Sequence, residues 1–130
     1  MKKIVSFFAV VILVFSGLYI YQRSLTIVNK QATRKISVGQ SITLRDKEAK
    51  FTIYKVDEGR SALDLLKEHS EVATRGEGTN AFVISINGKE ALSVNKEYWA
   101  FYVNGKPATA GSGSYKLKEG DKIEWRIEKY

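Results

Sequence analysis

The residues that could carry catalysis are few in this chain. Histidine occurs once, at position 69, and cysteine does not occur at all. A single histidine needs an oriented partner and a nucleophile to act as a general base, and no such group can be identified for His69. Neither a thiolate site nor a multi-histidine metal site can be assembled from this inventory. We therefore expect a protein that is not an enzyme and that has no metal or cofactor of its own.

The carboxylates and the glycine-rich stretches add no catalytic signature. The acidic pairs fall in expected turns or on solvent-facing sides, so no pair can be singled out for glycosidic chemistry. The two Gly-x-Gly stretches, 76–78 and 111–113, lack the GxxxxGK[ST] pattern that binds phosphate. A hydrolase is therefore the weakest of the functional classes.

The residues suited to binding gather in the last third of the chain, Tyr98–Tyr130. This segment is rich in aromatic side chains: Tyr98, Trp99, Phe101, Tyr102, Tyr115 and Trp125. The stretch 108–114, ATAGSGS, contains only small residues, which contribute little to a core and let a ligand approach the main chain closely. The pattern predicts a binding face made of an aromatic strand and a small-residue loop. An ordinary flexible hairpin loop is an equal alternative for 108–114.

The elements that position these residues follow from period-two patterns. In the final segment Ile123, Trp125 and Ile127 alternate with charged residues, which predicts a strand with one buried face. The run 98–103 is apolar on both faces, and Asn104-Gly105 behind it is a strong hairpin signal. We expect Phe101, Val103, Ile123, Trp125 and Ile127 to belong to the core.

Further upstream the sequence predicts strands at 41–44, 51–56 and 82–86 and one helix at 61–70. Ser61 followed three residues later by Asp64 resembles a capping box, and His69 is expected half buried on the apolar stripe of this helix. The polar stretch 70–80 is predicted to be a loop. The fold expected is α+β: a small domain with a mostly antiparallel sheet and one packed helix.

The N-terminus carries the clearest targeting signal. After Met1-Lys2-Lys3, residues 4–21 contain no charge, and as a helix they would span about 27 Å, close to the thickness of a bilayer core. We expect residues 1–22 to be an uncleaved membrane anchor and 23–35 a polar tether. A cleavable signal peptide, with a poor cleavage site near 14–16, is the alternative and would give a secreted protein.

Charge gives the expected surroundings of the domain, residues 36–130. Lys2 and Lys3 favour a cytoplasmic N-terminus and hence an extracytoplasmic domain, although basic residues beyond the segment oppose this. Without residues 1–21 the chain has 21 − 2 = 19 basic against 14 acidic groups, a surplus suited to an anionic wall or membrane surface. Lysine alternates with acidic residues, so no nucleic-acid partner is expected. The lack of cysteine favours a bacterial surface.

Several of these features together resemble the DUF4430 family, the bacterial form of the C-terminal domain of transcobalamin and intrinsic factor. The resemblance covers about residues 51–130. It rests on the Tyr98-Trp99 pair, Gly111, Tyr115 four residues later, the turn at 119–121 and the helix entry at 59–66. It implies a β-grasp-like fold. It also implies that the strand and loop matching Tyr98–Trp99 and Gly111–Tyr115 face a cobalamin ligand.

The resemblance implies a ligand for the predicted binding face. The candidate ligand-binding residues are Tyr98, Trp99, Tyr102, Gly111, Ser112, Gly113, Ser114 and Tyr115. The chain lacks the large helical barrel that supplies the other half of the cobalamin site in the vitamin carriers. We expect a membrane-anchored extracytoplasmic module that binds cobalamin, another corrinoid or a similar small molecule and hands it to a transporter. A surface module that recognises protein or wall polymer, without a small-molecule ligand, is the alternative.

Overall fold

The computed structural model describes residues 11–22, 33–44 and 47–130. The chain divides into two compact units, Met1–Thr33 and Arg34–Tyr130. In the first unit residues 11–22 form a helix. Within the described ranges no helix combines the length and apolar character needed to cross a membrane. Residues 4–10 of the predicted anchor and 23–32 of the predicted tether lie outside the described residues.

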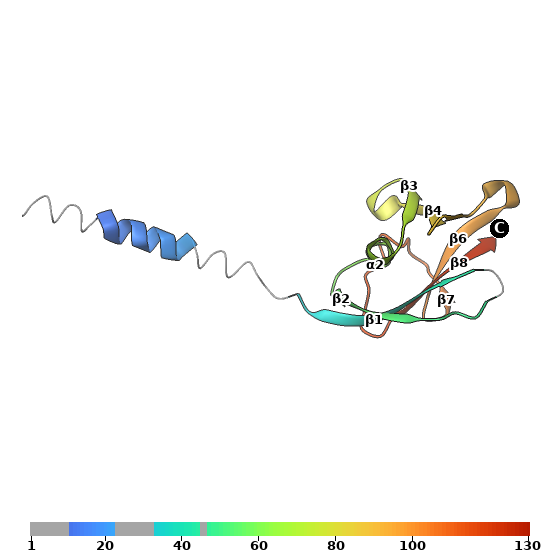
Figure 1. Cartoon of the computed structure of the whole chain (residues 1–130), viewed down its shortest axis with the longest axis horizontal. Coiled ribbons are helices and arrows are strands. Elements are labelled where there is room, and N and C mark those ends of the chain that lie inside the picture. Colours follow the sequence, from blue (N-terminus) through green and yellow to red (C-terminus); the bar gives the residue numbers. More distant parts are fainter. Residues whose placement is uncertain (1–10, 23–32, 45–46) are drawn as a thin grey trace, which may run out of the picture. The chain divides into compact units, whose positions relative to one another are not determined.

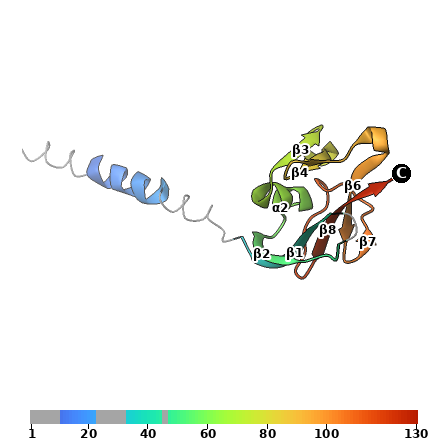
Figure 2. The same ribbon diagram turned by 45° about the vertical axis from the view of Figure 1, so that its right-hand side comes forward.

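The second unit is a small α+β domain built on a five-stranded sheet (Figure 1). Its strands are β1 (Lys35–Thr43), β2 (Thr52–Asp57), β6 (Glu97–Val103), β7 (Lys106–Pro107) and β8 (Lys122–Lys129), in the order β2-β1-β8-β6-β7. Most pairs are antiparallel, but β1 and β8 are parallel, with Gly39 opposite Lys122 and Thr43 opposite Arg126. The sheet is therefore mixed (Figure 2).

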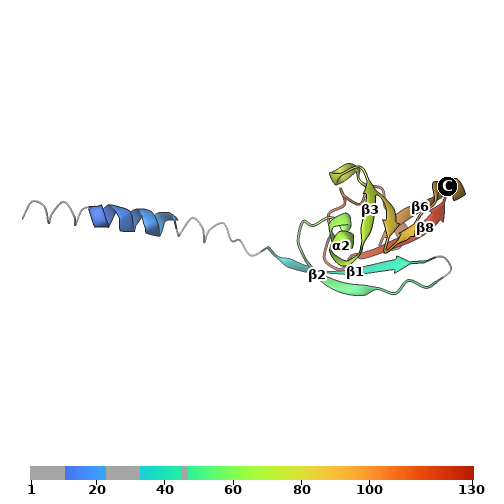
Figure 3. The same ribbon diagram turned by 45° about the horizontal axis from the view of Figure 1, so that its top comes forward.

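A second sheet and the helix α2 (Ala62–His69) pack on one face of the first sheet (Figure 3). The second sheet has the order β3-β4-β5, formed by β3 (Val72–Arg75), β4 (Phe82–Ile86) and β5 (Lys89–Glu90). Two 3₁₀ turns, Gly78–Asn80 and Ser93–Asn95, lie in its connections. The stretch 70–80, predicted to be a loop, thus contains the strand β3, because pairing with β4 satisfies a backbone whose own sequence is polar.

The helix α2 begins as the sequence predicts. The Asp64 amide donates to Ser61 Oγ (3.1 Å), and the Ser61 amide donates to Asp64 Oδ2 (2.9 Å), which completes a capping box. Burial alone would raise the pKa of Asp64, but these hydrogen bonds and the charge of Arg60 outweigh it and lower that pKa. The prediction for His69 was wrong: it is exposed, and its ring stacks on Tyr54 with the centroids 4.0 Å apart.

The core lies between the two sheets and α2. Its largest fully buried side chains are Trp125, Ile36, Leu65, Leu66, Ile86, Leu117, Ile123 and Val38. All of them belong to Arg34–Tyr130, so this unit holds its own hydrophobic core and is expected to fold without the N-terminal unit. Ile123, Trp125 and Ile127 are buried as predicted, while Phe101 and Val103 are half buried against them.

Candidate functional site

The aromatic strand β6 pairs with another strand on only one side along its first half. On one side it pairs with β8 over its whole length, from Glu97 opposite Lys129 to Val103 opposite Ile123. On the other side β7 pairs only with Tyr102 and Val103, and the Ala108 amide donates to the Phe101 carbonyl (3.1 Å). Among the described residues no strand pairs with Tyr98–Ala100 on that side, and the Glu97 amide donates to the Leu92 carbonyl (3.1 Å). Trp99 and Ala100 are nevertheless buried, because β4 packs against β6.

A hollow of about 280 Å³, which we call the β6 hollow, lies along this strand. Its walls come from β6 (Tyr98–Tyr102), the start of β4 (Ala81–Val83), the loop after β7 (Pro107, Ala108, Gly111 and Ser112) and β8 (Trp125 and Glu128). The hollow thus takes residues from both faces of β6. Apolar side chains make up most of its wall, with one carboxylate and two phenols among them.

The phenols and the carboxylate form the polar side of the β6 hollow. The Tyr102 hydroxyl donates to Glu128 Oε1 (2.5 Å), and the Tyr98 hydroxyl donates to Glu128 Oε2 (3.3 Å). The hydrogen bond to Glu128, followed by burial, raises the pKa of Tyr102. The Arg126 guanidinium lies 3.7 Å from the Tyr102 ring centroid. These contacts hold both phenols in place, so the polar side is preorganised.

Trp99 lies on the opposite, buried side of β6. Only 4% of it is exposed, and its indole N–H donates to the Lys89 carbonyl (3.1 Å). The period-two pattern places Trp99 on the same strand face as Phe101 and Val103, which were expected in the core. Trp99 thus belongs to the core and contributes only the small exposed part of its surface to the wall of the hollow.

The loop after β7 is anchored to the domain at its far end. The Leu63 amide donates to the Ser112 carbonyl (3.0 Å), and the Ala62 amide donates to the Tyr115 carbonyl (3.0 Å). These two bonds satisfy amides at the N-terminus of α2, which have no partner within the helix. A Cβ on Gly113 would lie 2.2 Å from the Gly78 carbonyl oxygen, so only glycine fits there. The small residues of this loop therefore serve a close approach within the protein.

Tyr115 closes the loop by binding Asp121. Its hydroxyl donates to Asp121 Oδ2 (2.9 Å), which also accepts from the Lys118 amide (3.0 Å). Burial, followed by the Asp121 hydrogen bond, raises the pKa of Tyr115 to about 12. Its ring meets Phe101 edge-on, with the centroids 6.1 Å apart. Tyr115 is thus placed to hold the loop and does not line the hollow.

The structure therefore brings some of the predicted site residues together and separates others. Tyr98, Trp99, Tyr102, Gly111 and Ser112 line the β6 hollow, whereas Gly113, Ser114 and Tyr115 do not. The wall that sequence reasoning missed is the start of β4, above all Phe82, which is 48% exposed. The alternation in 82–86 indicates a strand but does not tell which neighbour its exposed first residue will face. Among the described residues no three His, Cys, Asp or Glu side chains cluster as a metal site would require.

Fold and site thus define a small α+β domain with an apolar hollow along an aromatic strand. A family model described as a domain of unknown function, DUF4430, matches residues 59–129, more than half of the chain. The chain belongs to the DUF4430 family. No curated protein matches the sequence.

Two solved structures resemble the chain. A protein from Ruminococcus gnavus ATCC 29149, for which metal binding has been suggested, has a TM-score of 0.64 at 12% identity, over 73% of this chain and 98% of that one. At this identity the likeness shows the fold alone. Haptocorrin, solved in complex with Cbi, has a TM-score of 0.63 at 27% identity, over 77% of this chain but only 26% of haptocorrin. The chain therefore spans about a quarter of the length of haptocorrin.

Proposed function

We propose that this chain is an extracytoplasmic binding module, held at the membrane by residues 4–21, that binds a corrinoid or a similar small molecule in the β6 hollow. The observation that carries the proposal is the hollow itself. Residues of the aromatic strand and of the small-residue loop, which the sequence singles out for binding, share one apolar wall in a domain that resembles part of haptocorrin. The complex of haptocorrin with Cbi, a cobalamin analogue, supports the ligand class.

The size of the hollow sets the expected affinity. Pockets that enclose a whole small ligand usually measure about 300–1,000 Å³. The β6 hollow, at about 280 Å³, receives only one side of a corrinoid. We therefore expect the domain alone to bind weakly, with a Kd on the order of micromolar to millimolar. A transporter subunit or another surface protein would complete the site in the cell.

The membrane anchor is supported by the first unit. The helix at 11–22 exposes large apolar side chains, among them Leu13, Phe15 and Tyr19. Burying such side chains in hydrocarbon is favourable. Extraction of membranes with alkaline carbonate tests the anchor: the full chain should stay in the pellet. Its release, or a mature N-terminus beyond residue 16 by mass spectrometry, would refute anchorage by an uncleaved segment.

Calorimetric titration of residues 34–130 with cobalamin and cobinamide tests the ligand. The matched pair of variants is Phe82→Ala, in the wall of the hollow, and Phe51→Ala, an exposed aromatic outside it. We expect Phe82→Ala to weaken binding about tenfold, a change of about 1.4 kcal/mol, and Phe51→Ala to leave it unchanged. Both tryptophans of the chain, Trp99 and Trp125, line the hollow, so their fluorescence gives a second reading. Absence of heat at millimolar ligand would reject corrinoid binding.

The absence of a paired strand beside Tyr98–Ala100 among the described residues favours a second candidate, a surface module that binds an extended segment of another protein. Such a segment can add to a free strand edge through main-chain hydrogen bonds. A partner captured from surface extracts by the wild-type domain and by Phe51→Ala, but not by Phe82→Ala, would support it. Trp99→Ala is unsuited to this test because the substitution removes a core side chain.

A further inference from the structure

A second exposed apolar surface lies at the opposite edge of the five-stranded sheet. Phe51 and Ile53, just before and within β2, are 37% and 65% exposed. Both lie over Gly39 of β1, where an added Cβ would be 3.4 Å from Ile53 Cδ1 and 3.5 Å from Phe51 Cδ1. Because Gly39 has no side chain, both side chains lie close to the main chain of β1 at this position. Edge strands usually carry charge or are covered, so a paired aromatic and aliphatic side chain on an edge calls for a partner.

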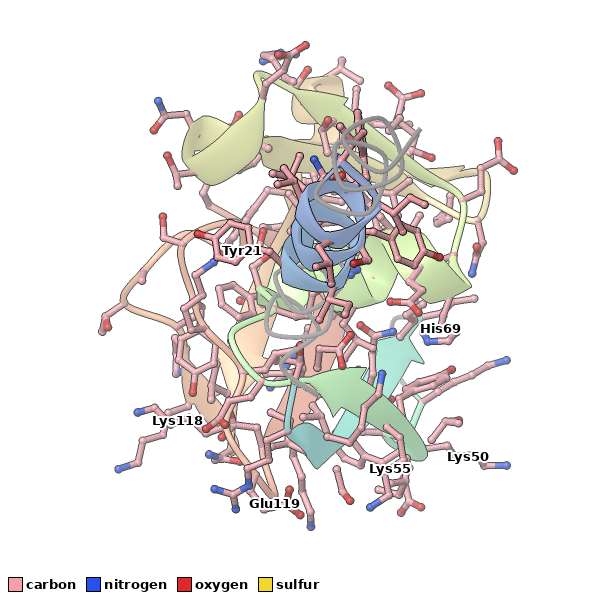
Figure 4. The ribbon with its side chains drawn as sticks, turned by 90° about the vertical axis from the view of Figure 1, so that its left-hand side faces the viewer. Tyr21, Lys50, Lys55, His69, Lys118 and Glu119 are labelled. Carbon is pink, nitrogen blue, oxygen red and sulfur yellow. The ribbon has the colours of Figure 1, made fainter. Side chains whose placement is uncertain are left out.

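Two lysines border these side chains. Lys122 Nζ lies 5.8 Å from the Phe51 ring centroid, and Lys55 Nζ donates to Ser37 Oγ (2.6 Å). Figure 4 shows Lys55 and Lys50 extending from the domain on the side of β2. Within the part of the chain that the structure describes, neither Lys55 nor Lys122 forms an ion pair with a carboxylate. We call Phe51, Ile53, Lys55 and Lys122 the β2 patch.

Carboxylates on β8 and in the turn before it make other contacts. Glu119 Oε2 accepts from the Ser37 amide (2.8 Å), and Glu124 lies 3.6 Å from Arg126 Nη2. The β2 patch therefore presents, next to two apolar side chains, two ammonium groups that form no ion pair with a described carboxylate. The aliphatic stems of the lysines extend the apolar area, and their exposed charged ends can turn outward, for Lys55 with loss of its hydrogen bond to Ser37 Oγ.

We propose that the β2 patch docks the domain onto an anionic lipid bilayer. The complementarity is of charge and of polarity: ammonium groups bind headgroup phosphates, and Ile53 and Phe51 enter the boundary between headgroups and acyl chains. A wall polyanion would use the lysines equally well but would gain nothing from Ile53. The combination on one surface therefore favours lipid over polymer.

Docking by β2 would also orient the domain. The sheet order β2-β1-β8-β6 puts three interstrand steps, about 14 Å, between β2 itself and β6, whereas Lys122 of the β2 patch lies on β8, one step from β6. This inference does not depend on a ligand in the hollow or on the N-terminal anchor, because the domain alone should bind lipid.

Vesicle co-sedimentation of residues 34–130 tests the proposal. The vesicles contain phosphatidylcholine alone or mixed with phosphatidylglycerol. We expect binding only to the mixed vesicles. Each of Ile53→Ser, Lys55→Gln and Lys122→Gln should weaken this binding about fivefold. The matched controls are Val94→Ser, an exposed aliphatic residue on another loop, and Lys106→Gln, on the opposite edge of the sheet. Both controls should bind like the wild type, and all five variants should melt like it because the changed side chains are exposed.

Two results of the vesicle assay would overturn the proposal. The first is absence of binding to the mixed vesicles, or binding that the patch variants and the controls weaken equally. The second is binding to vesicles that is lost in Lys55→Gln and Lys122→Gln but retained in Ile53→Ser. If these variants bind purified wall polyanion in the same pattern, the surface belongs to polymer. In the full chain reconstituted in nanodiscs, residues 51–55 should exchange deuterium more slowly with phosphatidylglycerol present. Unchanged exchange there would also count against it.

Discussion

Gly113 is the residue where the packing of the loop after β7 can be tested most directly. A Cβ at this position would lie 2.2 Å from the Gly78 carbonyl oxygen and 3.2 Å from Thr79 Cα, whereas real Cβ contacts essentially never fall below 3.0 Å. The loop and the 3₁₀ turn must then separate by at least 3.0 − 2.2 = 0.8 Å. Both partners are main chain, so no side-chain rotation can relieve the contact.

We expect Gly113→Ala to lower the free energy of unfolding by about 1–3 kcal/mol, the usual cost of overpacking. For a domain of this size each kcal/mol lowers Tm by about 4–8 °C. Thermal unfolding followed by circular dichroism measures the shift. Deuterium exchange at the Leu63 amide should also become faster, because its acceptor, the Ser112 carbonyl, moves with the loop.

Gly111→Ala is the matched control in the same loop. A Cβ there would lie 3.4 Å from the Thr79 carbonyl oxygen, a contact that a shift of a few tenths of an ångström relieves. We expect a change within about 0.5 kcal/mol for this variant. Equal melting temperatures for Gly113→Ala and Gly111→Ala would refute the claim that the small residues of the loop serve a close internal approach.

Two further substitutions test the structural roles of aromatic residues that the sequence assigns to the ligand. Trp99→Ala should lower the free energy of unfolding by about 3–5 kcal/mol, because it removes a buried indole and its hydrogen bond to the Lys89 carbonyl. A melting temperature near that of the wild type would contradict the core role of Trp99 and favour a role in ligand binding. Tyr115→Phe should cost about 1–2 kcal/mol at neutral pH through the lost hydrogen bond to Asp121. Because the folded pKa of Tyr115 is raised to about 12, its contribution is complete below the unfolded pKa of about 10 and is lost as pH rises through about 12. Denaturant unfolding across this range should show a smaller alkaline loss in the Phe variant, and an unchanged loss would contradict the role given to Tyr115.

The local elements were predictable where short-range chemistry decides them. Ser61 and Asp64 mark the helix start because a capping box is closed within four residues. Asn87 and Asn104 take positive φ ahead of glycine, as the hairpin signals predict. The alternation of Ile123, Trp125 and Ile127 identifies β8 because period two is a property of the strand itself.

Other elements were decided by their partners. β1 begins six residues earlier than its predicted start at 41. Its first half contains a glycine and polar residues, but it pairs with β2 on one side and β8 on the other, and this pairing makes it a strand. β3 is a strand only because β4 offers it hydrogen bonds. Pairing of this kind depends on residues far away in the chain, so no local pattern reveals it.

The sequence by itself determined that this protein has an aromatic strand, a capped helix, a loop of small residues, a single histidine and no cysteine. Only the tertiary structure decided what these features do. Trp99 points into the core, whereas Tyr98 and Tyr102 bind Glu128. Phe82 lines the hollow, and Gly113 packs against Gly78. The physical reason is that a residue type fixes which contacts are favourable, whereas the packing of distant strands fixes which of them are made.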